Sequence, residues 1–137
     1  MKLPAHAVSV DIDVPFHDCD PLFVVWHGRY FEYLEAGRTA LMRSCDLDVP
    51  VIRQMGYRMF IADVRCRYTY PLSYGDTARV TAWVLERTPL IRVAYVVQNL
   101  TQGRRSARAT TVLATTDGQG RLIPETPREI VERMPQP

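Results

Sequence analysis

The feature that most constrains the fold is a change of hydrophobic period along the chain. Residues from about 27 to 44 place Tyr30, Leu34, Gly37 and Leu41 on one stripe at helical spacing. Four later segments instead alternate apolar and polar residues with a period of two. A period near 3.6 is typical of an amphipathic helix, and a period of two is typical of a half-buried strand. The chain therefore combines one long helix with several strands.

The strands predicted from this alternation lie on both sides of the helix. They cover residues 7–14, 60–70, 78–84, 91–97 and 106–116. In the second of them, Phe60 and Val64 are expected to share the buried face. Short turns between the last four strands favour an antiparallel meander, and a helix on one face of such a sheet makes an α+β architecture. Pro127 is expected to open a short C-terminal helix over residues 128–134.

The length and composition indicate a single domain over residues 1–137. Hydrophobic residues make up 47% of the chain and charged residues 23%, which is ordinary for a globular protein. The helix carries aromatic flanks at Phe31 and Tyr33, so a sheet curling round the helix would bury both. A five-stranded sheet has two edges, and long alternating edge strands tend to pair with a second copy. We therefore expect a dimer at least.

The charge and the cysteines exclude several classes of function. A net charge of +2 gives little electrostatic attraction to nucleic acid, so no nucleic-acid partner is expected. Apolar runs such as residues 22–26 are too short to span a bilayer, and no apolar leader follows Lys2, so the expected location is the cytoplasm. Three cysteines without a C-x-x-C pair argue against disulfides and against a zinc site. His6, His17 and His27 lack ligand spacing, so no metal is expected.

Two carboxylates stand just before the expected helix. Asp18 and Asp20 belong to a polar loop, and the helix begins near His27. Aspartates in this position often cap a helix or solvate a loop. They also suit acyl chemistry, because a helix start offers unpaired N–H groups and a positive dipole end where an oxyanion can form. The residues alone favour the capping or loop-solvating role.

The same residues carry a resemblance to a known family. The segments 16–21, 24–30 and 35–38, with the turn at residues 74–76, resemble the hot-dog fold acyl-CoA thioesterases, and the 4-hydroxybenzoyl-CoA thioesterase branch in particular. The resemblance extends in order and spacing over residues 8–134. It implies a long central helix wrapped by a five-stranded antiparallel sheet. It also implies dimers joined edge to edge, often paired into homotetramers, with active sites at the dimer interface.

The function implied by the resemblance is hydrolysis of the thioester of an acyl-CoA without a metal or an organic cofactor. Asp20 matches the family's catalytic aspartate, as nucleophile or as general base, and Asp18 is expected to order the loop. The backbone N–H of His27 matches the family's carbonyl-polarising amide. Trp26 and Tyr30 are expected to line the substrate pocket.

Two positions depart from the family pattern. Phe23 stands where the family has a small residue, which would narrow the acyl pocket. Arg29 replaces an asparagine and is a candidate for contact with a phosphate or an acidic acyl group. Further arginines that could bind CoA phosphates are Arg65, Arg67, Arg104, Arg105 and Arg108. These departures leave two alternatives open: a non-catalytic module that binds acyl-CoA or lipid, and a hot-dog hydratase or dehydratase.

Overall fold

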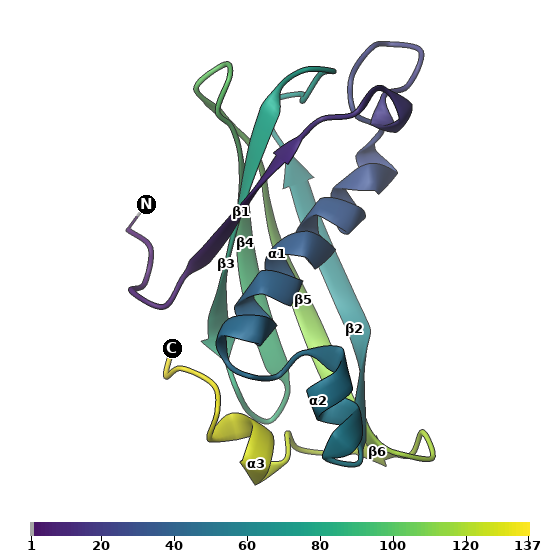
Figure 1. Ribbon diagram of the computed structural model, residues 1–137, viewed down its shortest axis with the longest axis vertical. Coiled ribbons are helices and arrows are strands. Elements are labelled where there is room, and N and C mark those ends of the chain that lie inside the picture. Colours follow the sequence, from purple (N-terminus) through teal and green to yellow (C-terminus); the bar gives the residue numbers. More distant parts are fainter. Residues whose placement is uncertain (1) are drawn as a thin grey trace.

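A computed structural model describes residues 2–137 as one antiparallel sheet with a long helix lying across one of its faces (Figure 1). Two 3-10 turns, Phe16–Asp18 and His27–Arg29, precede that helix. The helices and strands are β1 (Val8–Asp13), α1 (Tyr30–Ser44), α2 (Val49–Gln54), β2 (Tyr57–Tyr68), β3 (Thr77–Glu86), β4 (Ile91–Asn99), β5 (Arg104–Asp117), β6 (Leu122–Ile123) and α3 (Arg128–Val131). The α+β prediction of one long helix on an antiparallel sheet is confirmed, and β6 adds a sixth, two-residue strand.

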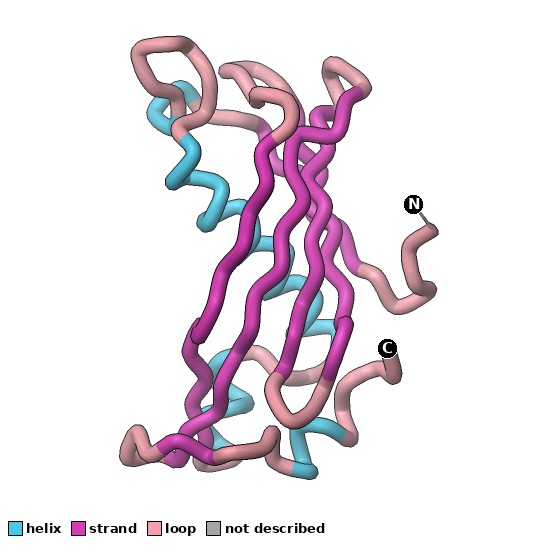
Figure 2. Tube along the Cα trace, turned by 180° about the vertical axis from the view of Figure 1, so that it is seen from behind, coloured by secondary structure: helices cyan, strands magenta, loops and turns pink. Residues whose placement is uncertain are grey.

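The order of strands in the sheet differs from the predicted meander. The sheet runs β1-β3-β4-β5-β2, with β6 paired to β5, and every pairing is antiparallel. Strand β2 therefore pairs with β5 and not with β3, so the loop over residues 69–76 connects one edge of the sheet to its far side (Figure 2). All strands share the same period, so alternation cannot reveal which ones pair.

Strand β2 contains a register shift that reverses its faces. The shift lies between Ile61 and Asp63 in the pairing with β5. Before it, Met59 packs against the core and Phe60 is 47% exposed. The prediction that Phe60 shares a buried face with Val64 is therefore wrong, because a bulge inserts one extra residue between them.

Helix α1 packs mainly against β1 and β3. Gly37 permits this close approach, because a Cβ atom at that position would lie 2.7 Å from Cγ1 of the buried Val80. Tyr33 is buried, whereas Phe31 is half exposed. The expectation that the sheet covers both aromatic flanks is therefore wrong for Phe31. The helix lies over one half of the sheet and leaves its side toward β2 open.

Two further helices occur outside the predicted long one. Helix α2 was not predicted; the Asp48 side chain caps it by accepting a hydrogen bond from the Val49 N–H at 2.8 Å, and Pro50 lies in its first turn. Helix α3 follows Pro127 as predicted but ends at Val131. None of the helices within residues 2–137 combines the length and the hydrophobicity that spanning a bilayer requires.

A buried polar cluster joins three loops at the end of the sheet next to the start of α1. The Asp76 carboxylate accepts hydrogen bonds from the Ser73 N–H at 2.9 Å and from Nδ2 of Asn99 at 2.8 Å. The Asn99 side-chain oxygen accepts from the Gln102 N–H at 2.9 Å. The backbone carbonyl of Asp76 accepts from the Val14 N–H. Asp76 and Asn99 are almost fully buried, so the cluster replaces the water that these groups lose on folding.

Replacing Asn99 by leucine is expected to lower the free energy of unfolding by about 2–3 kcal/mol, because the Asp76 carboxylate then stays buried with one partner fewer. Urea denaturation followed by circular dichroism measures the change. Gln102→Ala is the matched control, since Gln102 contributes only its backbone N–H to the cluster. Equal stabilities of the leucine variant and the wild type would contradict a stabilising role for the cluster.

Candidate functional site

The loop before α1 folds back on itself as a short two-stranded segment. Cys19 and Val25 form an antiparallel bridge, and the Asp20 N–H donates to the Val24 carbonyl at 2.9 Å. At the other end of the segment, the Trp26 N–H donates to the Asp18 carbonyl at 2.9 Å. These bonds give the loop a defined conformation that leads directly into the helix.

The loop is attached to the segment between β2 and β3. The Val25 N–H donates to the Leu72 carbonyl at 2.7 Å, and Val24 forms a bridge with Ser73. Ser73 in turn donates its N–H to Asp76. The buried cluster of Asp76 and Asn99 therefore positions the loop through a chain of backbone hydrogen bonds.

Asp18 has the structural role expected for it. Its side chain is buried, and Oδ2 accepts a hydrogen bond from the Tyr33 hydroxyl at 2.8 Å. Its other oxygen lies 3.7 Å from Nε of Arg29 and 3.4 Å from Nε2 of His17, and has no hydrogen-bond partner among residues 2–137. Arg29 also donates to Glu32 at 2.9 Å. The Arg29 guanidinium thus lies between two carboxylates at the helix start.

Asp20 lies at the tip of the folded loop and is partly exposed. Its carboxylate accepts a hydrogen bond from the Leu22 N–H at 2.8 Å, and its carbonyl accepts from the Phe23 N–H at 2.9 Å. Phe23 has a φ of 65°, a left-handed conformation that is unfavourable for a bulky side chain. The Phe23 ring is 72% exposed, so its packing does not compensate for this strain.

His27 begins the helical segment. No hydrogen-bond acceptor for its backbone N–H occurs within residues 2–137, and the N–H is therefore available to a ligand. The carbonyl of His27 accepts a hydrogen bond from the Tyr68 hydroxyl at 3.0 Å. The Trp26 ring covers Gly28, where a Cβ atom would collide with the indole. Backbone and side chains thus fix the helix start while leaving the His27 amide free.

Three tyrosines surround this helix start as neutral groups. Burial raises the pKa of Tyr30 to about 12. Burial and the neighbouring Asp18 carboxylate raise the pKa of Tyr33, and burial together with Cys66 raises that of Tyr68. Burial likewise raises the pKa of the Cys66 thiol. Near neutral pH these hydroxyls and this thiol stay protonated, so they are poor nucleophiles and poor bases.

The structure brings some of the predicted site residues together and separates others. Within the folded loop Asp18, and not Asp20, lies opposite Trp26 and next to the helix start, whereas Asp20 lies at the tip. Sequence reasoning missed Tyr68, which reaches His27 from β2; a tyrosine in an alternating strand gives no signal of such a contact.

The arginines considered for phosphate binding are spread over β2 and β5. Arg65 pairs with Asp63 at 3.3 Å, and the Arg104 guanidinium lies over the Tyr70 ring at 4.7 Å. Arg67 and Arg108 lie directly opposite each other in the β2–β5 register. Their role in binding phosphate stays a prediction. Within residues 2–137, no group of three or more His, Cys, Asp or Glu side chains is arranged to hold a metal ion.

Comparison with curated proteins identifies relatives of part of the chain. A Bacillus subtilis (strain 168) protein named "Putative acyl-CoA thioesterase YneP" is 30% identical over 79 residues, which cover 58% of this chain and 57% of the relative. The chain spans about half the length of the curated relatives that it matches.

Solved structures share the fold over most of the chain. A 4-hydroxybenzoyl-CoA thioesterase mutant complexed with 4-hydroxybenzoyl-CoA has a TM-score of 0.84 and 21% identity, covering 96% of this chain and 100% of that one. A thioesterase from Thermus thermophilus complexed with coenzyme A and Zn has a TM-score of 0.77 and 25% identity, covering 92% and 90%. The hot-dog fold expected from the sequence is confirmed by the first of these, whose low identity shows the fold alone.

The match to a family model is broader than that to the curated relatives. The family model describes the Thioesterase-like superfamily and matches residues 14–134, which include the folded loop, α1 and the whole of strands β2, β3, β4 and β5. The protein is therefore a member of the Thioesterase-like superfamily.

Proposed function

We propose that the protein hydrolyses the thioester bond of an acyl-CoA to a free acid and CoA. The observation that carries the proposal is one loop that presents both the unpaired His27 N–H at a helix start and the Asp20 carboxylate. Membership of the superfamily supports it, as do the name of the Bacillus relative and the bound coenzyme A of the Thermus thioesterase.

The His27 N–H polarises the thioester carbonyl. As the oxygen gains negative charge, this amide donates a hydrogen bond to it, and the positive end of the α1 dipole adds to the stabilisation. The carbonyl of Trp26, in the same peptide unit as this N–H, accepts a hydrogen bond from the Arg29 N–H at 2.8 Å, and the Tyr68 hydroxyl holds the His27 carbonyl in the next unit. The amide therefore needs no reorganisation when charge develops.

Asp20 supplies the carboxylate for the chemical step. As a nucleophile, its oxygen bonds to the acyl carbon, the C–S bond breaks, and CoA leaves as the thiolate; water then cleaves the mixed anhydride and regenerates the carboxylate. As a general base, it takes a proton from a water molecule that attacks the same carbon. Both routes need Asp20 to give up its hydrogen bond to the Leu22 N–H, a local change in an exposed turn.

The side chains around this point form the substrate walls. Phe23 and Trp26 are 72% and 51% exposed, which makes them available to an acyl group or to a second subunit. The buried Tyr30 lies beside them as a wall of the pocket, and Arg29, already between Asp18 and Glu32, faces the acidic or phosphate groups of the ligand.

The complete site forms in a homodimer that pairs through β2. This strand is an edge of the sheet, has twelve residues, and exposes Phe60, Ile61, Val64 and Tyr68. The other edge, β1, is half as long. A long exposed edge strand offers more unpaired backbone groups to a second copy than a short one does. Two such dimers make the homotetramer expected from the family resemblance. The cytoplasm is the proposed location, since the three cysteines are free thiols.

Asp20→Asn is expected to lower kcat for acyl-CoA hydrolysis by about 100-fold or more, because the amide is neither a nucleophile nor a base at this position. Release of free CoA is followed with a thiol reagent over a panel of acyl-CoA esters. Asp63→Asn, on the exposed outer face of β2, is the matched control. Inactive wild-type protein, or equal rates for Asp20→Asn, would refute the proposal. Tight binding of an ester without turnover would favour a non-catalytic binding module. Addition of water to an enoyl-CoA would favour a hydratase.

Phe23→Gly is expected to raise the free energy of unfolding by about 1 kcal/mol, since glycine adopts a positive φ without strain. The same change should widen the acyl pocket and shift the preference toward bulkier acyl groups. Thermal denaturation and relative kcat/KM values across the ester panel measure the two effects. Leu22→Gly is the control, because Leu22 is equally exposed and lacks the positive φ. A loss of stability in Phe23→Gly would contradict the strain argument.

Val64→Glu is expected to convert a dimer into monomers, because it places a charge at the proposed β2–β2 contact. Light scattering after size-exclusion chromatography gives the mass. Leu85→Glu on β3 is the control, as Leu85 is 38% exposed and Val64 36%. A wild-type mass equal to one chain, or dimers in the Val64 variant, would rule out pairing through β2.

A further inference from the structure

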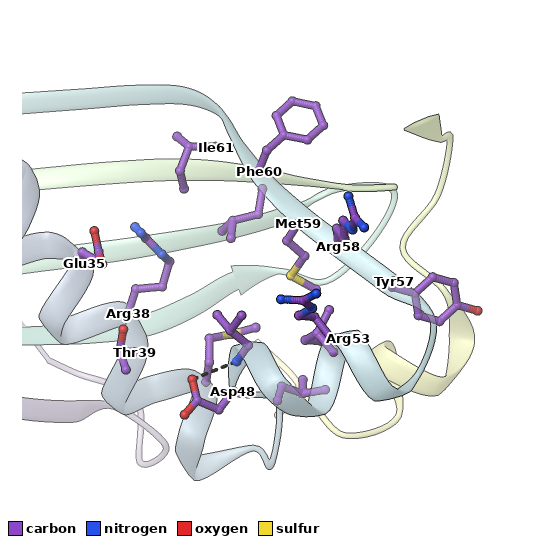
Figure 3. Close-up of a pocket in the computed structure, with 15 residues that line it drawn as sticks. Glu35, Arg38, Thr39, Asp48, Arg53, Tyr57, Arg58, Met59, Phe60 and Ile61 are labelled. Atoms are coloured by element: carbon purple, nitrogen blue, oxygen red, sulfur yellow. Dashed lines mark hydrogen bonds between the residues drawn. The ribbon is translucent and has the colours of Figure 1, made fainter. Parts of the chain in front are cut away.

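A cavity lies away from the folded loop, between α1, α2 and the first half of β2. It measures about 530 Å³. Apolar side chains form much of its wall, namely Met42, Leu47, Ile52, Met59, Ile61 and Leu113. Figure 3 shows the side chains of both helices and of β2 around this space. A cavity of this size and lining suits the apolar part of a small ligand.

Three arginines also line this cavity. Arg38 comes from α1, Arg53 from α2 and Arg58 from β2, and none of them has a carboxylate within 4 Å among residues 2–137. Of the carboxylates in the wall, Asp48 already pairs with Arg43 at 2.8 Å and caps α2.

Glu35, the other carboxylate in the wall, lies three residues before Arg38, a spacing that permits an ion pair on the helix surface. The described part of the chain contains no such pair. Three arginines thus share the wall with two carboxylates, of which Asp48 is already paired with Arg43. The cavity therefore carries positive charge within largely apolar walls, an arrangement that favours an anionic group on an apolar ligand.

Arg38 is the least exposed of the three arginines. Its Nη1 donates a hydrogen bond to the Tyr95 hydroxyl at 3.3 Å, and this hydroxyl shares a 2.6 Å hydrogen bond with Thr111 Oγ1. Tyr95 is 1% exposed, so the guanidinium is anchored to the sheet beneath the cavity. Figure 3 shows Arg38 extending from α1 toward this space. The remaining N–H groups of the fork are available to a carboxylate.

The cavity and the helix start lie along the same side of α1. Arg38 follows His27 by eleven residues, which is roughly 16 Å along the helix axis at 1.5 Å per residue. Strand β2 runs beside both points, since Tyr68 contacts His27 and Ile61 lines the cavity. To reach this cavity, an acyl chain whose thioester is held at the His27 N–H has to pass the rings of Tyr30 and Tyr68, which are in edge-to-face contact at 4.8 Å between ring centroids.

We propose that the cavity binds an acyl group ending in a carboxylate, with Arg38 as the residue that selects it. The inference rests on the proposed thioesterase function and specifies its substrate class: the CoA thioester of a medium-length dicarboxylic acid. Apolar walls contact the methylene chain, and the Arg38 fork binds the terminal carboxylate through two charge-assisted hydrogen bonds.

The test compares two esters that differ only at the far end of the chain, octanoyl-CoA and octanedioyl-CoA. Wild type should show a higher kcat/KM for octanedioyl-CoA. Arg38→Gln should lower that value by about tenfold or more and change the octanoyl-CoA value by less than about threefold. Arg38→Lys keeps the charge and should retain part of the preference. Arg128→Gln, on α3 and outside the cavity, is the matched control.

The outcomes separate this proposal from the proposed function. Equal kcat/KM values for the two esters in wild type, or an equal loss on both esters in Arg38→Gln, would overturn carboxylate selection while leaving thioester hydrolysis intact. If neither these two esters nor any other ester of the panel is hydrolysed, the proposed function fails, and calorimetric titration with octanedioic acid and with octanoic acid decides the binding site. Binding of the diacid that weakens in Arg38→Gln would support the site, and absence of that binding would overturn it.

Discussion

The hydrogen bond between the buried Asn99 and Asp76 side chains is the interaction on which the candidate site depends. It joins the turn after β4 to the segment before β3, and the Asp76 backbone also binds Val14 at the end of β1. That segment holds the folded loop through the bond from the Val25 N–H to the Leu72 carbonyl. A buried carboxylate that lacks hydrogen-bond partners destabilises the folded state, so the cluster is stable only when all of its hydrogen bonds form. The loop that carries the Asp20 carboxylate and the free His27 amide is thereby attached to a rigid support.

The off-centre position of α1 has the second large effect. The helix lies over β1 and β3, with Gly37 against Val80, and leaves the side toward β2 uncovered. This one packing choice produces both the apolar cavity near Arg38 and the exposed edge of β2. A central helix would fill the cavity with side chains. The open side is therefore what gives a small domain room for a ligand and a surface for a second subunit.

Apart from the missed helix α2, the errors of prediction concern contacts between distant segments. The helix and the five main strands follow from local periodicity, and the structure contains all of them. Pairing of β2 with β5, the bulge that turns Phe60 outward, and the exposure of Phe31 depend on which elements meet. At the candidate site, the positions of Asp18 and Asp20 before the helix could be predicted from the sequence. The hydrogen bond from the Tyr33 hydroxyl to Asp18 forms only when α1 packs beside the loop.

The amino-acid sequence by itself determined the α+β class, the long helix, the loop with its two aspartates and the resemblance to hot-dog thioesterases. These depend on residue type and spacing, which are local properties of the chain. Only the tertiary structure decided that Asp18 is the buried carboxylate, that the His27 amide lacks an acceptor, and that Arg38 lines a cavity without an ion pair. Burial, hydrogen-bond partners and charge compensation are set by residues far apart in the chain, and no period in the sequence encodes them.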